Sequence, residues 1–300
     1  STSAVLDDRR IEELSSGRDR GAGIRVVCGE TTGFAHTADL SFSGLRAAAE
    51  TASAAANSGG GGVRQVDLDS SSGPAPAFVR IFPEDVPKAR KVALLEQADD
   101  AARSTGGAIS QVTARYADSQ RRIQIANSEG LLTGDHQVRS LFSVSCVASG
   151  DTGLQTGRES VGRTAGFELF DEVDVHDLAR KAASRALTKL DAVPAPSGEM
   201  PVVVGPGGGG VLFHEACGHG LEADLVAKSA SVFAGRRGET VAAPSVSLVD
   251  DGTMVGEWGR FAVDDEGRPA QRNVLIENGV LTDYMWDRLR AVREGREGSG

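Results

Sequence analysis

The stretch Gly207-Gly-Gly-Gly-Val-Leu-Phe-His214-Glu215-Ala-Cys-Gly-His219 decides how this 300-residue chain folds locally and which chemistry it carries. Two histidines flank one glutamate directly after a run of glycines. A catalytic zinc ion takes three protein ligands and leaves a fourth position to water, whose pKa falls to about 7. Neutral imidazoles are suitable ligands, and a carboxylate beside the first can take a proton from that water. The stretch therefore predicts the core of a zinc hydrolase.

The spacing of the two histidines predicts a deformed helix. In the commoner H-E-x-x-H pattern they lie four residues apart, roughly 40° from each other around a regular helix. Here they lie five apart, roughly 140° on a regular helix, so both rings reach one ion only if the turn is widened. A single-turn π-bulge widens a helix in this way. We therefore expect a bulge between residues 214 and 219, with Gly218 letting the backbone deform.

Other interpretations of this stretch stay open. A buried histidine is more often a satisfied core residue than a ligand, and short motifs produce false positives. A chance occurrence of the pair is disfavoured because the chain has only five histidines, and two of them flank this glutamate. A strand, a glycine-rich turn and a helix also suit phosphate binding, but the Lys-Ser/Thr ending of a P-loop is missing. Cys217 is a further candidate ligand, although its place between the two histidines would require awkward geometry.

Composition limits the class of protein. The 38 glycines among 300 residues are well above the usual share of about 7% and predict a turn-rich, sheet-rich chain. A net charge of −10 argues against a general nucleic-acid binder, which would show a basic face to the phosphates. No run reaches the roughly 18 apolar residues of a membrane span, and a signal-peptide pattern is missing. We expect a soluble, cytoplasmic protein without membrane or nucleic-acid partners.

The three cysteines indicate free thiols in a reducing compartment. Cys28, Cys146 and Cys217 are far apart, odd in number and without a C-x-x-C pair. Cys28 and Cys146 lie in apolar runs typical of strands, so we expect both to be buried as small hydrophobic residues.

The first half of the chain predicts hairpins and helices. Residues 24–40 are typical of two strands around a Gly-Glu turn, followed by a helix from Phe42 to Asn57 with Ser41 as its N-cap. Residues 58–62 and 70–76 are expected to be loops. A second helix is expected over residues 84–103, with one apolar face. The residues expected on that face are Val92, Leu95 and Ala102.

Residues 109–190 predict antiparallel strands followed by a helix. Residues 109–148 alternate as strands do, with turns expected at 127–130 and at Gly134-Asp135. The polar, glycine-punctuated residues 150–166 are expected to form a long loop. Asp174 is placed as the N-cap of a helix that ends at Leu190. The expected apolar stripe of this helix is Leu178, Ala182, Ala186 and Leu190.

Residues 191–198 resemble a domain linker, because two prolines and a glycine interrupt both periodicities. Beyond it we expect a strand at 201–204, a glycine turn and a helix from Val211 to about Leu221. Three further strand-rich runs follow, with Asp-Gly and Asn-Gly hairpin signals. They cover residues 245–253, 256–267 and 272–286.

These elements predict an α+β fold. Residues 1–190 form an N-terminal α/β region with antiparallel strands, helices and a flexible loop near 58–76. Residues 199–300 begin a β-rich C-terminal domain that carries the zinc-motif helix. An exposed strand edge near the metal could hold an extended peptide by strand addition.

Several separated runs resemble one known family. GVLFHEACGHGLEAD (210–224), SVFAGRRGE, VDDGT, GEWGRFAVDDEGRPAQ and LIENGVLTDYMWDR resemble the TldD branch of the TldD/PmbA family of metallopeptidases. Upstream, IRVVCGETTGFAHTADLS, IANSEGLL, QTGRES, GFELFD and GEMPVVV are also similar to that family. The resemblance covers essentially the whole chain.

The resemblance implies a zinc peptidase with an N-terminal α/β region and a β-rich C-terminal domain. Its H-E-x-x-x-H motif, carried over to this chain, makes His214 and His219 ligands of Zn²⁺ and Glu215 the catalytic carboxylate. The family's third ligand is a downstream cysteine, expected here beyond residue 300, so the chain is expected to be a fragment of a longer protein. Glu222 and Asp224, the nearest oxygen candidates, are then expected to be solvated or helix-end charges.

The resemblance also implies substrates and partners. Family members cut unfolded or leader-type peptides, together with a PmbA/TldE-type partner that lacks the metal motif; a homo-oligomer is the other possibility. The alternative function is a non-catalytic peptide-binding or scaffold subunit with structural zinc or none. The intact Glu215 favours the peptidase, because a structural site needs no carboxylate beside its ligand. His36, His136 and His176 are expected to have surface roles in a strand end, a turn and a helix start.

Overall fold

The computed structural model describes residues 1–29, 31–56, 66–70, 78–151 and 153–300. By its internal contacts the chain divides into two units. One unit comprises Ser1 with residues 16–67, and the other comprises residues 2–15 with residues 68–300. The loops expected at 58–62 and 70–76 lie outside the described residues, except for Ser70, which ends a short strand.

The N-terminal unit is a hairpin covered by one helix. Strand β3 (Ala22–Cys28) pairs antiparallel with β4 (Thr31–Thr37), and α1 (Phe42–Ala55) follows. The hydroxyl of Ser41 accepts a hydrogen bond from the Gly44 amide at 3.2 Å, which caps the helix as predicted. A Cβ on Gly33 would lie 1.9 Å from the Ala52 carbonyl oxygen, so the helix backbone packs directly on the hairpin. The predicted hairpin and helix are confirmed.

The second unit is built on a six-stranded sheet in the order β2-β1-β6-β7-β5, with β8 also paired to β7. β1 pairs antiparallel with β6, β6 with β7 and β7 with β8, whereas β5 pairs parallel with β7. The predicted turn at residues 127–130 joins the two longest strands. The bounds of the strands are β1 (Thr2–Asp7), β2 (Arg10–Ser16), β5 (Asp69–Ser70), β6 (Ile109–Ala126), β7 (Leu131–Gly150) and β8 (Gly153–Arg163).

Two expectations for this sheet were wrong. Gly134-Asp135 is no turn but part of β7, where a Cβ on Gly134 would lie 2.4 Å from the Ile123 carbonyl oxygen. The glycine serves the close approach of neighbouring strands. Residues 150–166 are no long loop, because β8 pairs with β7 along its whole length. His136 consequently lies within a strand, with its ring stacked on Phe82 at 5.9 Å.

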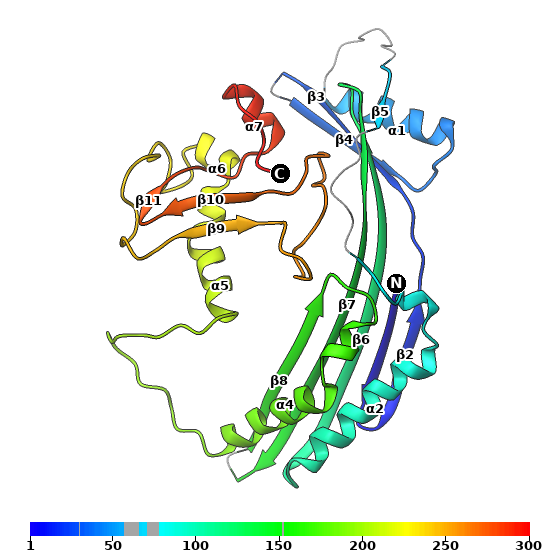
Figure 1. The fold of residues 1–300 in the computed structure, drawn as a ribbon, viewed down its shortest axis with the longest axis vertical. Helices are drawn as coiled ribbons and strands as arrows, with labels where there is room; N and C mark the ends of the chain where they lie inside the picture. Colours follow the sequence, from blue (N-terminus) through cyan, green and yellow to red (C-terminus); the bar gives the residue numbers. More distant parts are fainter. Residues whose placement is uncertain (30, 57–65, 71–77, 152) are drawn as a thin grey trace. The chain divides into compact units, whose positions relative to one another are not determined.

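Helices α2 (Lys88–Ser104) and α4 (Val175–Leu190) lie side by side along this sheet (Figure 1). α4 has its predicted bounds, and the Asp174 carboxylate accepts a hydrogen bond from the His176 amide at 2.8 Å. α2 begins four residues later than predicted, because Pro87 holds the residue before it in an extended conformation. Two short helices precede these, η1 (Pro83–Asp85) and α3 (Leu169–Glu172).

Buried side chains from both helices and the sheet form one core. They include Leu6, Leu95, Ala98, Ala102, Val112, Tyr116, Phe142, Val144, Phe167, Ala182, Ala183 and Ala186. Cys146 lies in this core as predicted, but Cys28 is exposed at the end of β3, contrary to the prediction. All three cysteines are free thiols. None of the helices in the described parts of the chain is long and apolar enough to cross a bilayer.

The last hundred residues contain a smaller sheet in the order β11-β10-β9 and a second core. Asn278 and Gly279 join β10 to β11 with φ of 48° and 84°, the left-handed pair that an Asn-Gly hairpin requires. Residues 256–267 form turns and irregular backbone instead of the expected strands, apart from an isolated bridge between Val263 and Pro269. The elements are β9 (Leu248–Asp251), β10 (Arg272–Glu277), β11 (Val280–Leu281), α6 (Ala223–Ala227) and α7 (Arg288–Arg293). The predicted α+β class, with antiparallel sheets and helices, is confirmed.

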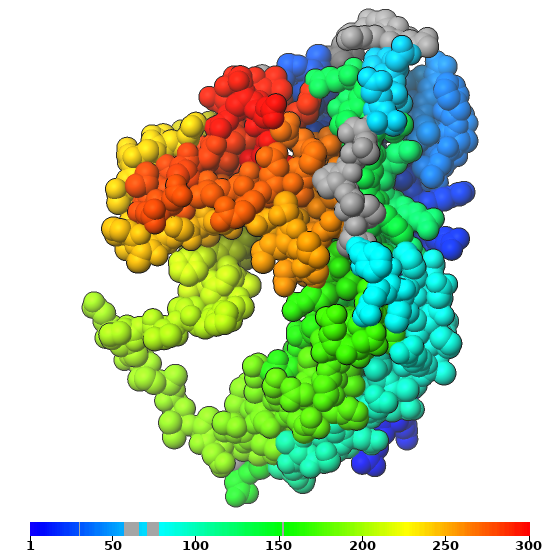
Figure 2. All heavy atoms as spheres, viewed as in Figure 1, coloured from blue at the N-terminus to red at the C-terminus, as the bar shows by residue number. Residues whose placement is uncertain are grey.

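The segment from residue 191 to residue 207 has neither helix nor strand. The strand expected at 201–204 was wrong: Val202 is 73% exposed and Val203 98% exposed. Within the described residues no strand pairs with this segment, and a lone extended backbone does not make a strand. Figure 2 shows it as a single file of residues. The domain boundary at 191–198 stays a prediction.

Candidate metal site

The histidine motif lies on a helix that changes its winding at the first histidine. An α-helical segment, α5 (Gly208–Phe213), is followed by one π-helical turn, η2 (His214–Gly218), and one 3-10 turn, η3 (His219–Leu221). The amide of His219 donates to the carbonyl of His214, five residues back. The predicted bulge is therefore confirmed. It brings the two imidazole centroids to 4.5 Å, with their planes at 66°.

Gly218 has a smaller part in the bulge than predicted. Its φ and ψ are both −55°, which any residue adopts in a helix. A Cβ added there would meet the Nδ1 of His214 at 3.5 Å, an ordinary van der Waals distance. The π-turn therefore forms with helical dihedral angles and does not depend on the conformational freedom of glycine.

His214, Glu215 and His219 form a group that fits a metal ion. One ligand atom from each lies within 4.8 Å of the others. Two nitrogens bound to one tetrahedral zinc ion lie roughly 3.4 Å apart, which is within that limit. The Nε2 of His219 lies 3.9 Å from the Glu215 carboxylate, and both side chains are exposed, by 50% and 65%. Two imidazole ligands with a carboxylate beside them, the carboxylate acting as general base, are typical of hydrolytic zinc sites on a helix.

The opposite nitrogen of His219 has a partner that the sequence did not reveal. Its Nδ1 lies 2.8 Å from an oxygen of Glu222. The available signal was the spacing of three residues, which puts two side chains on one face of a helical turn. Asp224, the other carboxylate considered as a ligand, pairs with Lys228 at 2.9 Å.

The remaining candidates lie elsewhere. Cys217 packs against the core of the last hundred residues and is not part of the His-Glu-His group. His36 lies in β4, His136 in β7 and His176 in the first turn of α4.

The end of the motif is fixed to the C-terminal part of the chain by backbone hydrogen bonds. Met285 donates to the Leu221 carbonyl at 2.8 Å and accepts from the Ala223 amide at 2.9 Å. The Ser231 hydroxyl donates to the Gly220 carbonyl. Leu221 and Ala223 are buried, so the residue between them has little freedom.

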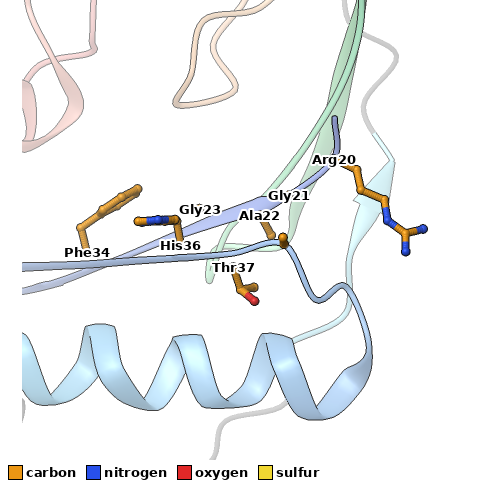
Figure 3. Close-up of a pocket in the computed structure, with 8 residues that line it drawn as sticks. Arg20, Gly21, Ala22, Gly23, Phe34, His36 and Thr37 are labelled. Carbon is orange, nitrogen blue, oxygen red and sulfur yellow. The ribbon is translucent and has the colours of Figure 1, made fainter. Parts of the chain in front are cut away.

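A separate hollow lies in the N-terminal unit. It is open, has a volume of about 340 Å³ and is mainly apolar. Phe34 and His36, 6.4 Å apart and stacked, project from β4 on the side away from α1 (Figure 3). It lacks the acids and clustered ligands of the motif, and we assign it no catalytic role.

Comparison with known proteins covers most of the chain. Models of the PmbA/TldA metallopeptidase family match in three pieces: domain 1 over residues 1–56, the central domain over 82–190 and the C-terminal domain over 197–300. A metalloprotease TldD homolog of Haemophilus influenzae is 37% identical over 99% of this chain and 63% of its own length. A metalloprotease of Methanothermobacter thermautotrophicus is also 37% identical, over 100% of this chain and 65% of its own. The chain thus spans slightly under two thirds of these relatives.

The fold is also found in a solved structure. TldE from Thermococcus kodakarensis superposes with a TM-score of 0.78 at 21% identity, over 100% of this chain and 67% of that one.

Proposed function

Because the chain belongs to the PmbA/TldD family of metallopeptidases, we propose that the full-length protein is a zinc-dependent peptidase with His214 and His219 as metal ligands and Glu215 as general base. The observation that supports this most is the π-turn, which directs two imidazoles and one carboxylate to a common point. A regular helix would place the rings roughly 140° apart.

Each residue then has a separate task. The two imidazoles hold the ion while neutral. Zinc, when bound, is a Lewis acid that makes a water molecule more acidic. Glu215 would accept a proton from the attacking water as its oxygen bonds to the peptide carbonyl carbon. It would then give that proton to the amine nitrogen as the C–N bond breaks, so the carboxylate would end as it began. The third ligand that the family resemblance implies is a cysteine thiolate outside these 300 residues.

The substrate we propose is an unfolded or leader-type peptide held in an extended conformation. A site whose ligands are exposed suits a flexible chain that must reach it. β9 is an outer strand of its sheet among the described residues and is a candidate for strand addition. We propose a TldE-type subunit as the partner, from the likeness in fold to a protein of that name, with a homo-oligomer as the other outcome.

The test is Glu215→Gln in the full-length protein, with and without a TldE-type partner, on a peptide library. We expect zinc content to stay and cleavage to fall by about 10²- to 10⁴-fold, the usual contribution of a general base. Glu239→Gln, which removes an exposed carboxylate paired with Arg236, is the control and should cleave as the native protein does.

Two results would contradict the proposal. Undiminished cleavage by Glu215→Gln would leave the carboxylate without a catalytic role and favour the scaffold alternative. Equal zinc in the native protein and in a His214→Ala, His219→Ala double variant would put the metal elsewhere.

A further inference from the structure

We propose that Glu222 is a positioning residue, which holds the imidazole of His219 so that its Nε2 faces the metal. This inference rests on the proposed zinc site and adds a residue to it. Its basis is the 2.8 Å contact between the Nδ1 of His219 and the Glu222 carboxylate.

The contact selects one tautomer of the ring. A carboxylate can only accept a hydrogen bond, so the proton of the neutral imidazole lies on Nδ1. The lone pair available to a metal is then on Nε2, which lies on the side of Glu215, at 3.9 Å from its carboxylate. A carboxylate on the remote nitrogen also increases the basicity of the ligand.

Glu222 can orient the ring because its own backbone is held. The residues on either side, Leu221 and Ala223, are buried and hydrogen-bonded to Met285. Glu222 has an extended conformation between η3 and α6, with φ of −72° and ψ of 126°. The side chain therefore leaves a backbone that is anchored by a segment more than sixty residues further along the chain. A free helix-end charge would have no such support.

The geometry separates this role from that of a ligand. Glu215 and Glu222 approach opposite nitrogens of the same imidazole. The group of side chains that can share an ion contains Glu215 and leaves out Glu222. Glu222 lies behind the ligand, where carboxylates commonly support metal-bound histidines.

The experiment measures zinc affinity in the full-length protein by competition with a chromophoric chelator. Glu222→Ala should weaken zinc binding by about 10- to 100-fold. Glu222→Gln, which keeps an acceptor oxygen for the Nδ1 proton, should recover part of that loss. The control is Asp224→Asn, because Asp224 is as exposed as Glu222, 40% against 41%, and pairs with Lys228 instead of a histidine. It should change the affinity by less than about threefold, since its charge is screened by solvent.

The outcomes are distinct. Native affinity in Glu222→Ala would overturn the proposal, as would an equal loss in Asp224→Asn, which would make the effect one of general charge. An equal loss in Glu222→Gln and Glu222→Ala would also overturn it, because the accepting oxygen would then be irrelevant. The His214→Ala, His219→Ala double variant tests the site separately: if it binds zinc like the native protein, the proposed function fails and not merely the role of Glu222. Thermal unfolding of the metal-free variants should be unchanged, which excludes a general loss of structure.

Discussion

Replacing Gly157 by Ala tests the packing of α4 on β8, the strand that the sequence did not predict. A Cβ on Gly157 would lie 2.0 Å from the Ala182 carbonyl oxygen and 2.5 Å from the Ala186 amide nitrogen. Ordinary contacts of this kind begin near 3.4 Å, so helix and strand must separate by more than 1 Å. The atoms in the way are helix backbone, which cannot rotate aside as a side chain can.

The magnitude follows from this contact. Overpacking a well-filled core costs about 1–3 kcal/mol. We expect the upper end, about 3 kcal/mol of the free energy of unfolding, because Ala182, Ala183 and Ala186 are completely buried and would lose contacts together. Urea unfolding followed by circular dichroism measures the change.

Gly107→Ala is the matched control. A Cβ there would have no atom within 4 Å, so the substitution should stabilise by about 0.4–1 kcal/mol through the unfolded chain. If Gly157→Ala lies within about 0.5 kcal/mol of the native protein, α4 does not pack on β8 as closely as described.

Three further predictions concern buried or half-buried groups. Lys91→Met leaves Asp118 buried without its partner at 2.6 Å and should cost about 3–5 kcal/mol, whereas Lys91→Met with Asp118→Leu should recover most of that; urea unfolding of the four forms measures it. Burial alone would raise the pKa of Asp283, but hydrogen bonds from Trp286 and Arg296 bring it below 3.8. The ionised Asp283 carboxylate therefore contributes its full stabilisation of the folded state well above pH 3.8, and this contribution is lost as the pH falls through the lower folded-state pKa. The melting temperatures of the native protein and of Asp283→Asn should accordingly converge in acid. Burial raises the pKa of the Cys146 thiol to about 11, so Ellman's reagent at pH 8 should label the exposed Cys28 first and Cys146 only after unfolding.

Local signals in the sequence predicted local structure well. Ser41 and Asp174 cap their helices, and Asn278-Gly279 forms a hairpin turn, because each depends on atoms within three residues. The two errors in the large sheet concern backbone that is explained only by a distant neighbour. Gly134 was predicted to be a turn, yet it accommodates the carbonyl of Ile123 on the next strand.

The polar, glycine-rich sequence of β8 was wrongly predicted to be a loop for the same reason. A strand pattern in the sequence reports side chains that alternate between core and solvent. Here one face meets the backbone of α4 so closely that Gly157 replaces the apolar side chain that alternation requires. The apolar run at 201–204 shows the opposite error. Its side chains suit a strand, but no described strand pairs with it.

In the candidate site, too, one feature follows from local spacing and another depends on residues far along the chain. The π-turn was predictable because the angle between two ligands on a helix depends only on their spacing, and five residues demand a wider turn whatever surrounds them. The contact of Glu222 with His219 depends in addition on Met285, which holds the backbone on both sides of Glu222. Met285 adjoins Tyr284, whose hydroxyl donates to the Phe233 carbonyl at 2.6 Å within the second core. The direction of the His219 nitrogen that we propose as a metal ligand is therefore linked, through Met285 and Tyr284, to the packing of that core.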